Sequence, residues 1–173
     1  MMCYKAAPQS RNQLRRYVQY IKEKTGLQNE IFFPILPFVE NVLPMMFPDY
    51  QFEILPKEVM GSKHGETYPN KNIIRIREDI YEGAASGKGR DRLTVAHEVG
   101  HFFNHEEDSI ILCRLAPGQK LKPYEDPEWQ ADAFAGELLA PSHLIRNMSV
   151  QEVMLKCGVS EAAAKNQLRH CWE

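Results

Sequence analysis

The stretch His97-Glu98-Val99-Gly100-His101 sets the strongest constraint on how this 173-residue chain folds. In an α-helix, residues four apart lie about 40° apart around the axis and one turn apart along it, so His97 and His101 can reach one small cation. Glu98 lies about 60° around the axis from His101, close enough to contact a water on that cation without binding the cation itself. The pattern H-E-x-x-H is typical of zinc hydrolases, in which neutral imidazoles bind zinc and the glutamate is the general base.

The residues around this pattern predict a helix buried in a hydrophobic core. They are apolar on nearly every side of the helix: Leu93, Val95, Ala96, Val99, Phe102 and Phe103. Polar side chains on such a helix cost free energy unless they are hydrogen-bonded or bind a metal. A pair of hydrogen-bonded core histidines beside a surface glutamate is the alternative interpretation. Gly100 costs about 1 kcal/mol relative to alanine in a helix, so we expect it to let another backbone approach closely.

A third metal ligand must come from elsewhere, because a catalytic zinc takes three protein ligands and leaves the fourth position to water. His105 continues the four-residue series, but its Cα lies about 12 Å along a straight helix from that of His97. One metal ion does not bridge that distance comfortably. We therefore interpret His105 as a neighbour that packs or hydrogen-bonds near the site, with a role as ligand as the alternative.

A second motif runs from Asp126 to Pro141 and predicts the helix that supplies this ligand. Asp126 fits the N-cap, Pro127 the first helical position and Pro141 the end. The predicted buried stripe consists of Ala131, Phe134, Ala135, Leu138 and Leu139. Glu128 suits a metal ligand, and Asp132 suits a carboxylate that accepts a proton from a ligand histidine and fixes its tautomer. Spacing alone leaves open whether Glu128 is only a favourable acid in a helix first turn.

The two motifs together resemble the ImmA/IrrE family of small bacterial and phage metallopeptidases. They read Arg92-Leu-Thr-Val-Ala-His-Glu-Val-Gly-His-Phe-Phe-Asn-His105 and Glu128-x-x-Ala-Asp-x-Phe-Ala-x-Glu-Leu-Leu-Ala-Pro141. The resemblance runs from about Tyr68 to Pro141 and more loosely to the C-terminus. Family members carry a methionine before the proline that closes the second motif, whereas this chain has Ala140, a packing difference that touches no proposed ligand.

This resemblance implies a minimal zincin fold of the glutamate-zincin type, in which a small mixed or antiparallel sheet packs on the metal-site helix. It implies His97, His101 and Glu128 as ligands of Zn²⁺ and Glu98 as the general base. It also implies a substrate, a helix-turn-helix transcriptional repressor that is often encoded next door in phages and integrated elements.

The remaining patterns predict an α+β chain that forms one domain over residues 1–173. We expect N-terminal helices within 1–48, the sheet and both motifs within 49–141, and a C-terminal helical segment within 142–173. The expected elements are helices at 9–25 and at 37–47 with a kink or early stop at Pro44, strands at 50–54 and 110–113, a hairpin of 63–68 with 72–77, a turn at 116–120, and helices after Ser149 and Ser160. The strand at 72–77 is expected to be the sheet edge that receives an extended substrate. Arg11, Arg15 and Arg16 are expected to form a solvated face of the first helix.

Composition limits the classes of function. Hydrophobic residues at 43% and charged residues at 25% are ordinary for a soluble globular protein, and the net charge of −2 argues against a protein that coats nucleic acid or a membrane surface. No apolar run approaches about 20 residues and no signal-peptide pattern is visible, so we expect a cytoplasmic protein. The four cysteines, Cys3, Cys113, Cys157 and Cys171, lack C-x-x-C spacing and are expected to be reduced thiols.

These observations predict a zinc-dependent endopeptidase that hydrolyses a peptide bond in a cytoplasmic regulatory protein. Two hypotheses from other classes remain. One is a zinc-containing binding module that inactivates a partner regulator stoichiometrically, and the other is a DNA-binding regulator, which the charge balance disfavours. Tyr124 and His143 flank the second motif and are candidates for stabilising the oxyanion.

Overall fold

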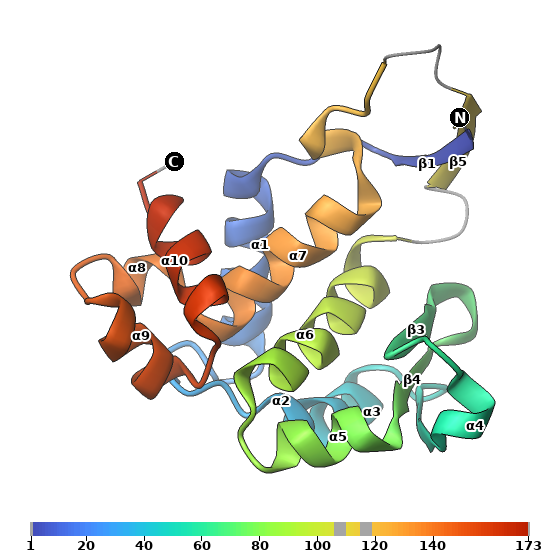
Figure 1. Cartoon of the computed structure of the whole chain (residues 1–173), viewed down its shortest axis with the longest axis horizontal. Helices are drawn as coiled ribbons and strands as arrows, with labels where there is room; N and C mark the ends of the chain where they lie inside the picture. Colours follow the sequence, from blue (N-terminus) through green and yellow to red (C-terminus); the bar gives the residue numbers. More distant parts are fainter. Residues whose placement is uncertain (1, 106–109, 115–118, 173) are drawn as a thin grey trace.

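Two helices that pack side by side at the centre of the molecule organise the fold (Figure 1). The computed structural model describes residues 2–105, 110–114 and 119–172. Helix α6 (Gly89–Asn104) carries the H-E-x-x-H pattern, and α7 (Pro127–Leu139) carries the second motif. Gly100 lies where they meet, since a Cβ atom there would be only 2.9 Å from the carbonyl oxygen of Ala131. The missing side chain lets the two backbones approach, as predicted.

The caps and the apolar stripe of α7 follow the sequence pattern. The carboxylate of Asp126 accepts a hydrogen bond from the amide of Glu128 at 3.0 Å, and Pro127 is the first helical residue. All five predicted stripe residues are fully buried: Ala131, Phe134, Ala135, Leu138 and Leu139. Helix α1 (Arg11–Lys24) opens with a capping box between Ser10 and Gln13 and packs on α7.

A three-stranded sheet packs on α6 through β3 (Gly65–Tyr68), as the α+β prediction requires. The strand order is β2 (Gln51–Leu55), β4 (Ile73–Arg77), β3, with β4 parallel to β2 and antiparallel to β3. The predicted hairpin is therefore confirmed, but the prediction that 72–77 forms the sheet edge is wrong. Alternation in β4 shows that Ile74 and Ile76 face the core, where both are fully buried. Alternation says nothing about how many strands pair with β4.

A separate two-stranded ribbon joins the N-terminus to the middle of the chain. Strand β1 (Met2–Ala6) pairs antiparallel with β5 (Ile110–Arg114), which confirms the short strand expected at 110–113. Cys3 and Cys113 face each other in this register and form a disulfide, with their Cα atoms 5.3 Å apart. This corrects the prediction of reduced thiols for these two cysteines, whereas Cys157 and Cys171 are free and buried. A separation of 110 residues leaves no local spacing signal for the pair.

The predicted helix around Pro44 is continuous but changes its winding. It consists of α2 (Ile35–Pro37), the π turn η1 (Phe38–Val42) and α3 (Leu43–Met46). A proline inside an α-helix removes one amide donor and clashes with the carbonyl four residues before it. The wider π turn just before Pro44 relieves that clash, so the helix continues past the proline to Met46.

The C-terminal helices α9 (Val150–Cys157) and α10 (Glu161–Arg169) begin after Ser149 and Ser160, as predicted. Three other described helices were not predicted: α4 (Lys57–Met60), α5 (Glu78–Ala85) and α8 (Ser142–Ile145), together with the 3₁₀ turns η2 (Pro69–Lys71) and η4 (Pro123–Glu125). Of the turn expected at 116–120, residues 116–118 lie outside the described part. Within that part, no helix has the length and apolar character that a membrane span requires.

The basic cluster on α1 is not the solvated face that was expected. Arg11 is buried, and its Nη1 donates to Oε1 of Gln167 on α10 at 3.4 Å. Arg15 Nε donates to Oε1 of the buried Glu137 on α7 at 3.2 Å. These contacts join α1 to α7 and α10, and only Arg16 of the three is exposed. Local charge does not reveal that helices from the far end of the chain cover this face.

The disulfide predicts a thiol count. Protein purified and denatured without reductant should show two reactive thiols, Cys157 and Cys171, because Cys3 and Cys113 are joined. A phosphine reductant should raise the count to all four cysteines. Titration with a chromogenic thiol reagent measures both values, and Cys3→Ser should show three thiols because it frees Cys113. Four thiols in unreduced wild type would contradict the disulfide.

Candidate metal centre

Three side chains from the two central helices converge at one point. His97 and His101 come from α6 and Glu128 from the first turn of α7, with one donor atom of each within 4.8 Å of the others. The two Nε2 atoms of the histidines are 2.9 Å apart. The carboxylate oxygens of Glu128 lie 3.2 Å from Nε2 of His97 and 3.4 Å from Nε2 of His101. The structure brings together all three residues predicted as ligands.

The hydrogen bonds of the imidazoles leave both Nε2 atoms available to a cation. Nδ1 of His97 donates to Oδ1 of Asp132 at 2.7 Å, and Nδ1 of His101 lies 2.9 Å from Nδ1 of His105. A neutral imidazole with its proton on Nδ1 carries a lone pair on Nε2. Two such lone pairs facing each other beside a carboxylate repel unless a cation lies among them. Two imidazole nitrogens and one carboxylate oxygen are the donor set of a catalytic zinc site, so the residues fit this metal.

A buried glutamine fixes the tautomer of His101 through His105. The amide nitrogen of Gln130 donates to the carbonyls of Ala7 and Tyr124, each at 2.8 Å, so its Oε1 is the atom that faces Nε2 of His105 at 2.9 Å. His105 must then carry its proton on Nε2 and accept at Nδ1. The proton of His101 therefore lies on Nδ1, which leaves its Nε2 for the metal. The structure places His105 as a hydrogen-bonded neighbour of the ligands.

Burial and nearby carboxylates set the charges at the site. Burial opposes protonation of His97, but hydrogen bonds to Asp132 and Glu128 outweigh it and raise the pKa of His97 to about 10. The neighbouring imidazoles of His101 and His97 lower the pKa of Glu128, so this carboxyl stays ionised. Burial lowers the pKa of His105 to about 4, which keeps its imidazole neutral.

Glu98 lies beside the ligands and is held by β3. The hydroxyl of Thr67 donates to Oε2 of Glu98 at 2.6 Å and also lies 3.1 Å from its backbone carbonyl oxygen. Burial raises the pKa of Glu98, and the hydrogen bond from Thr67 opposes that rise. A carboxylate whose pKa lies nearer the working pH is a better general base. Gly65 on β3 leaves room for the side chain of Glu98, because a Cβ at this position would lie 2.6 Å from Cγ of Glu98.

The sequence pattern did not single out Thr67, Gly65 or Gln130. Alternation in the hairpin marks strands but not the side chain that reaches across to another helix. A glutamine inside an apolar stripe is a signal for Gln130, since a buried amide needs partners.

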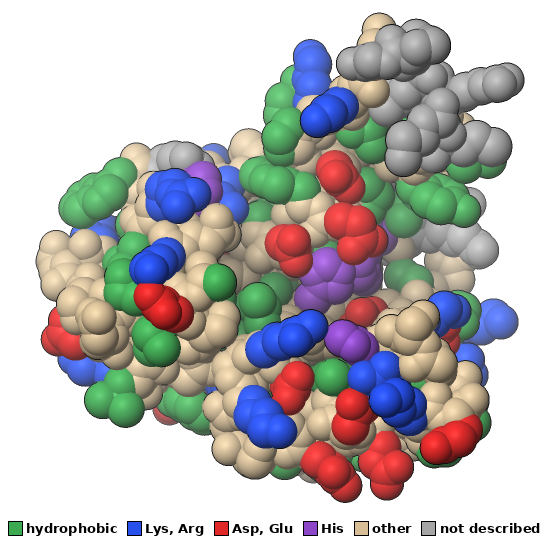
Figure 2. All heavy atoms as spheres, in the orientation of Figure 1, with side chains coloured by type: hydrophobic (Ala, Val, Ile, Leu, Met, Phe, Trp, Pro, Cys, Tyr) green, Lys and Arg blue, Asp and Glu red, His purple; other side chains and the backbone are tan. Residues whose placement is uncertain are grey.

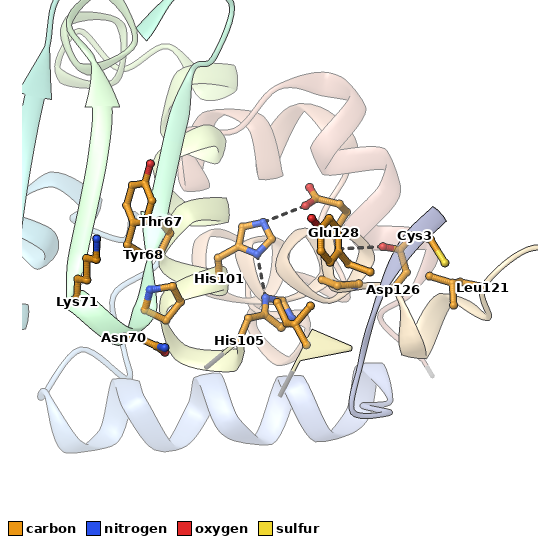
Figure 3. Close-up of a pocket in the computed structure, with 14 residues that line it drawn as sticks. Cys3, Thr67, Tyr68, Asn70, Lys71, His101, His105, Leu121, Asp126 and Glu128 are labelled. Atoms are coloured by element: carbon orange, nitrogen blue, oxygen red, sulfur yellow. Dashed lines mark hydrogen bonds and ion pairs between the residues drawn. The ribbon is translucent and has the colours of Figure 1, made fainter. Parts of the chain in front are cut away.

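These groups lie at the floor of a cleft between the hairpin and the N-terminal strand, as the close-up in Figure 3 shows. A cavity of about 700 Å³ lies over the ligands, with Gly65 to Tyr68 of β3 on one side and with Tyr4 and Ile110 of the ribbon on the other. Figure 2 shows histidine side chains at the bottom of this hollow and acidic side chains along one rim. The site is therefore open to a large ligand.

The two candidates for stabilising the oxyanion do not line this cleft. Tyr124 belongs to the turn before α7, where the ammonium of Lys122 lies 5.6 Å from the centre of its ring. His143 lies in α8, beyond the far end of α7, and its Nδ1 is 3.3 Å from Nε2 of Gln19. His143 lies next to the second motif in sequence but far from the ligands in space, because the whole length of α7 separates it from Glu128.

The hydrogen bonds of Gln130 predict an effect on metal binding at a distance. Gln130→Met keeps similar volume but removes the acceptor that fixes His105, so the affinity for Zn²⁺ should fall about 10-fold or more. Competition with a chromophoric chelator measures this affinity. Gln19→Met, an amide substitution beyond the other end of α7, serves as the control. Unchanged zinc affinity in a folded Gln130→Met variant would refute the tautomer argument.

The comparisons with known proteins agree with this geometry. The family profile of the IrrE N-terminal-like domain, peptidase family M78, matches residues 53–169, a range that contains every ligand and Glu98. No curated protein matches the chain. The matched range covers more than half of the chain, so this protein belongs to the IrrE N-terminal-like family of M78 metallopeptidases.

Proposed function

We propose that this chain is a zinc-dependent endopeptidase. The observation that carries the proposal is the position of Glu98, a buried carboxylate beside three convergent donor atoms on the floor of an open cleft. A site that only stabilises a fold has no use for a general base, and it more often closes its coordination with a fourth protein ligand. Within the described residues, no fourth ligand joins the group of His97, His101 and Glu128.

Each side chain has a distinct task in peptide-bond hydrolysis. His97, His101 and Glu128 would hold zinc, which when bound polarises the scissile carbonyl and lowers the pKa of a water molecule. Glu98 accepts a proton from the attacking water and later delivers it to the leaving amine. The hydroxyl of Thr67 keeps the Glu98 carboxylate in place for both transfers.

The outer edge of β3 suits a substrate in extended conformation. β3 pairs with β4 on one side, and its other edge borders the cleft over the ligands. Backbone pairing with an edge strand orients a peptide and brings one of its bonds across the site. β4 cannot play this part, because it pairs with β2 and β3 on its two sides.

As the substrate we propose a cytoplasmic regulatory protein, in particular a helix-turn-helix transcriptional repressor cut within an accessible segment. The support is the resemblance of the two sequence motifs to the ImmA/IrrE family. The alternative is a zinc-containing module that inactivates such a regulator by binding alone. Neither version requires direct contact with nucleic acid or with a membrane. The Cys3–Cys113 disulfide counts against a cytosolic location of this protein, because disulfides are rare in cytosolic proteins.

The ligand assignment predicts the metal content. Purified protein should carry about one zinc ion, held by two imidazoles and one carboxylate. Alanine at His97, His101 or Glu128 should each remove most of it, whereas His105→Phe should weaken binding without abolishing it. Elemental analysis after dialysis measures the content. Zinc retained in Glu128→Ala but lost in His105→Phe would reverse the assignment of the third ligand.

The role of Glu98 separates hydrolysis from metal binding. Glu98→Gln should keep the fold and the zinc but lose cleavage about 10²–10⁴-fold, because an amide does not accept the proton of water. The assay incubates the zinc-loaded protein with the repressor encoded by the adjacent gene and follows its fragments by mass spectrometry. Chelation of zinc in the wild type should stop cleavage equally. Full activity of Glu98→Gln would sink the mechanism, and stoichiometric inactivation without fragments would favour the binding module.

A further inference from the structure

Two further hollows extend the cleft along α6, one on each side of the ligands. On the His97 side lies a cavity of about 350 Å³ that Arg90, Thr94 and His64 line. On the His101 side lies one of about 580 Å³ that reaches the N-terminal strand. β3 runs in the same direction, with Gly65 at the first hollow and Tyr68 at the second. The cleft is thus a continuous path on which the two ends differ in chemistry.

The end beside His97 carries one exposed cation, Arg90, together with the carboxylates of Glu98 and Asp132. Arg90 is exposed and lies seven residues before His97, two turns away on the same face of α6. Both carboxylates that line this hollow have partners, since Asp132 accepts from His97 and Glu98 accepts from Thr67. Across residues 2–105, 110–114 and 119–172, no carboxylate forms an ion pair with Arg90. Its guanidinium is therefore available to an anionic group in the cleft.

The end beside His101 is apolar. Its lining includes Tyr4 from β1, Tyr68 from β3, and Ile110, Leu121 and Pro127. Figure 3 shows Tyr68 and Leu121 on opposite sides of this hollow, with His101 and His105 between them. Tyr4 and Tyr68 are 64% and 37% exposed, so large aromatic surfaces stand open to solvent beside the metal ligands. A large apolar side chain that enters here would remove such surface from water.

We propose that the cleft selects an extended protein segment with an acidic side chain at the Arg90 end and a large apolar side chain at the Tyr4–Tyr68 end, on opposite sides of the cleaved bond. This specificity rests on the proposed peptidase function. The axial distance from Arg90 to His97 is about 10 Å at 1.5 Å per residue. An extended chain advances about 3.3 Å per residue, so the acid lies about three residues from the bond.

A different role for Arg90 would be to support the metal site by pairing with Asp132 when its side chain moves. That role affects zinc affinity and not sequence preference. A solvated arginine affects neither. Zinc affinity and sequence preference, measured together, therefore distinguish the three possible roles of Arg90.

The test compares wild type with Arg90→Gln and Arg90→Glu, all zinc-loaded, on a proteome-derived peptide library whose cut bonds are read by mass spectrometry. Wild type should enrich Asp and Glu about three residues from the cut on one side and aromatic or aliphatic residues on the other. Arg90→Gln should remove the acidic enrichment, and Arg90→Glu should replace it with Lys and Arg. Arg16→Glu, which alters an exposed arginine on α1, should leave the wild-type pattern.

A binding measurement keeps the inference independent of hydrolysis. In the Glu98→Gln background, fluorescein-labelled peptides that differ only by Asp or Lys at the predicted position are titrated by fluorescence anisotropy. The Asp peptide should bind about two- to fivefold more tightly than the Lys peptide, and Arg90→Glu should reverse the order. A reversed preference without any hydrolysis by wild type would refute the peptidase and keep the subsite. Equal binding of both peptides, or an acidic preference that survives Arg90→Glu, would overturn the subsite.

Discussion

The site depends on how closely α6 and α7 pack, because its ligands come from both helices. Gly100 on α6 lies against the backbone of Ala131 on α7, and any side chain there would force the helices apart. Zinc bonds to nitrogen and oxygen are only about 2.0–2.2 Å long. Moving α7 away from α6 would therefore take Glu128 out of reach of a zinc ion bound by the two histidines. The helical instability of one glycine, about 1 kcal/mol, is offset by packing that no larger residue permits.

Around this contact, buried polar groups are joined into chains of hydrogen bonds, which is the condition for keeping them in a core. His97 is held by Asp132, and His101 is held through His105 by Gln130. Every proton in the second chain has one possible position once the amide of Gln130 is fixed by two backbone carbonyls. The imidazoles are therefore oriented before a metal binds, so binding need not order them.

The parts of the fold that were predicted correctly are set by interactions between residues close in sequence. The N-cap of Asp126, the stripe of α7 and the hairpin of β3 and β4 each depend on residues close in sequence. The errors concern partners far away in the chain. Nothing near Cys3 points to Cys113, nothing in β4 reveals its parallel pairing with β2, and nothing near Arg15 points to Glu137. The ligands could be predicted because side chains that bind one metal ion must follow a restricted spacing in the sequence. Thr67, in contrast, reaches Glu98 through tertiary packing alone.

The N-terminal segment shows that the site is larger than the part of the chain that defines the family. The ligands and Glu98 lie within residues 53–169, where the family profile matches, but β1 lies outside this range. β1 contributes Tyr4 to the wall of the cleft, and the carbonyl of Ala7 just after it holds the amide of Gln130. The disulfide to Cys113 and the ion pair of Lys5 with Glu125 at 2.8 Å fix this segment against the rest. The N-terminal segment thus shapes the wall of the cleft and also helps to orient His101 through Gln130 and His105. A change in this segment would therefore affect both the shape of the cleft and the geometry of the metal ligands.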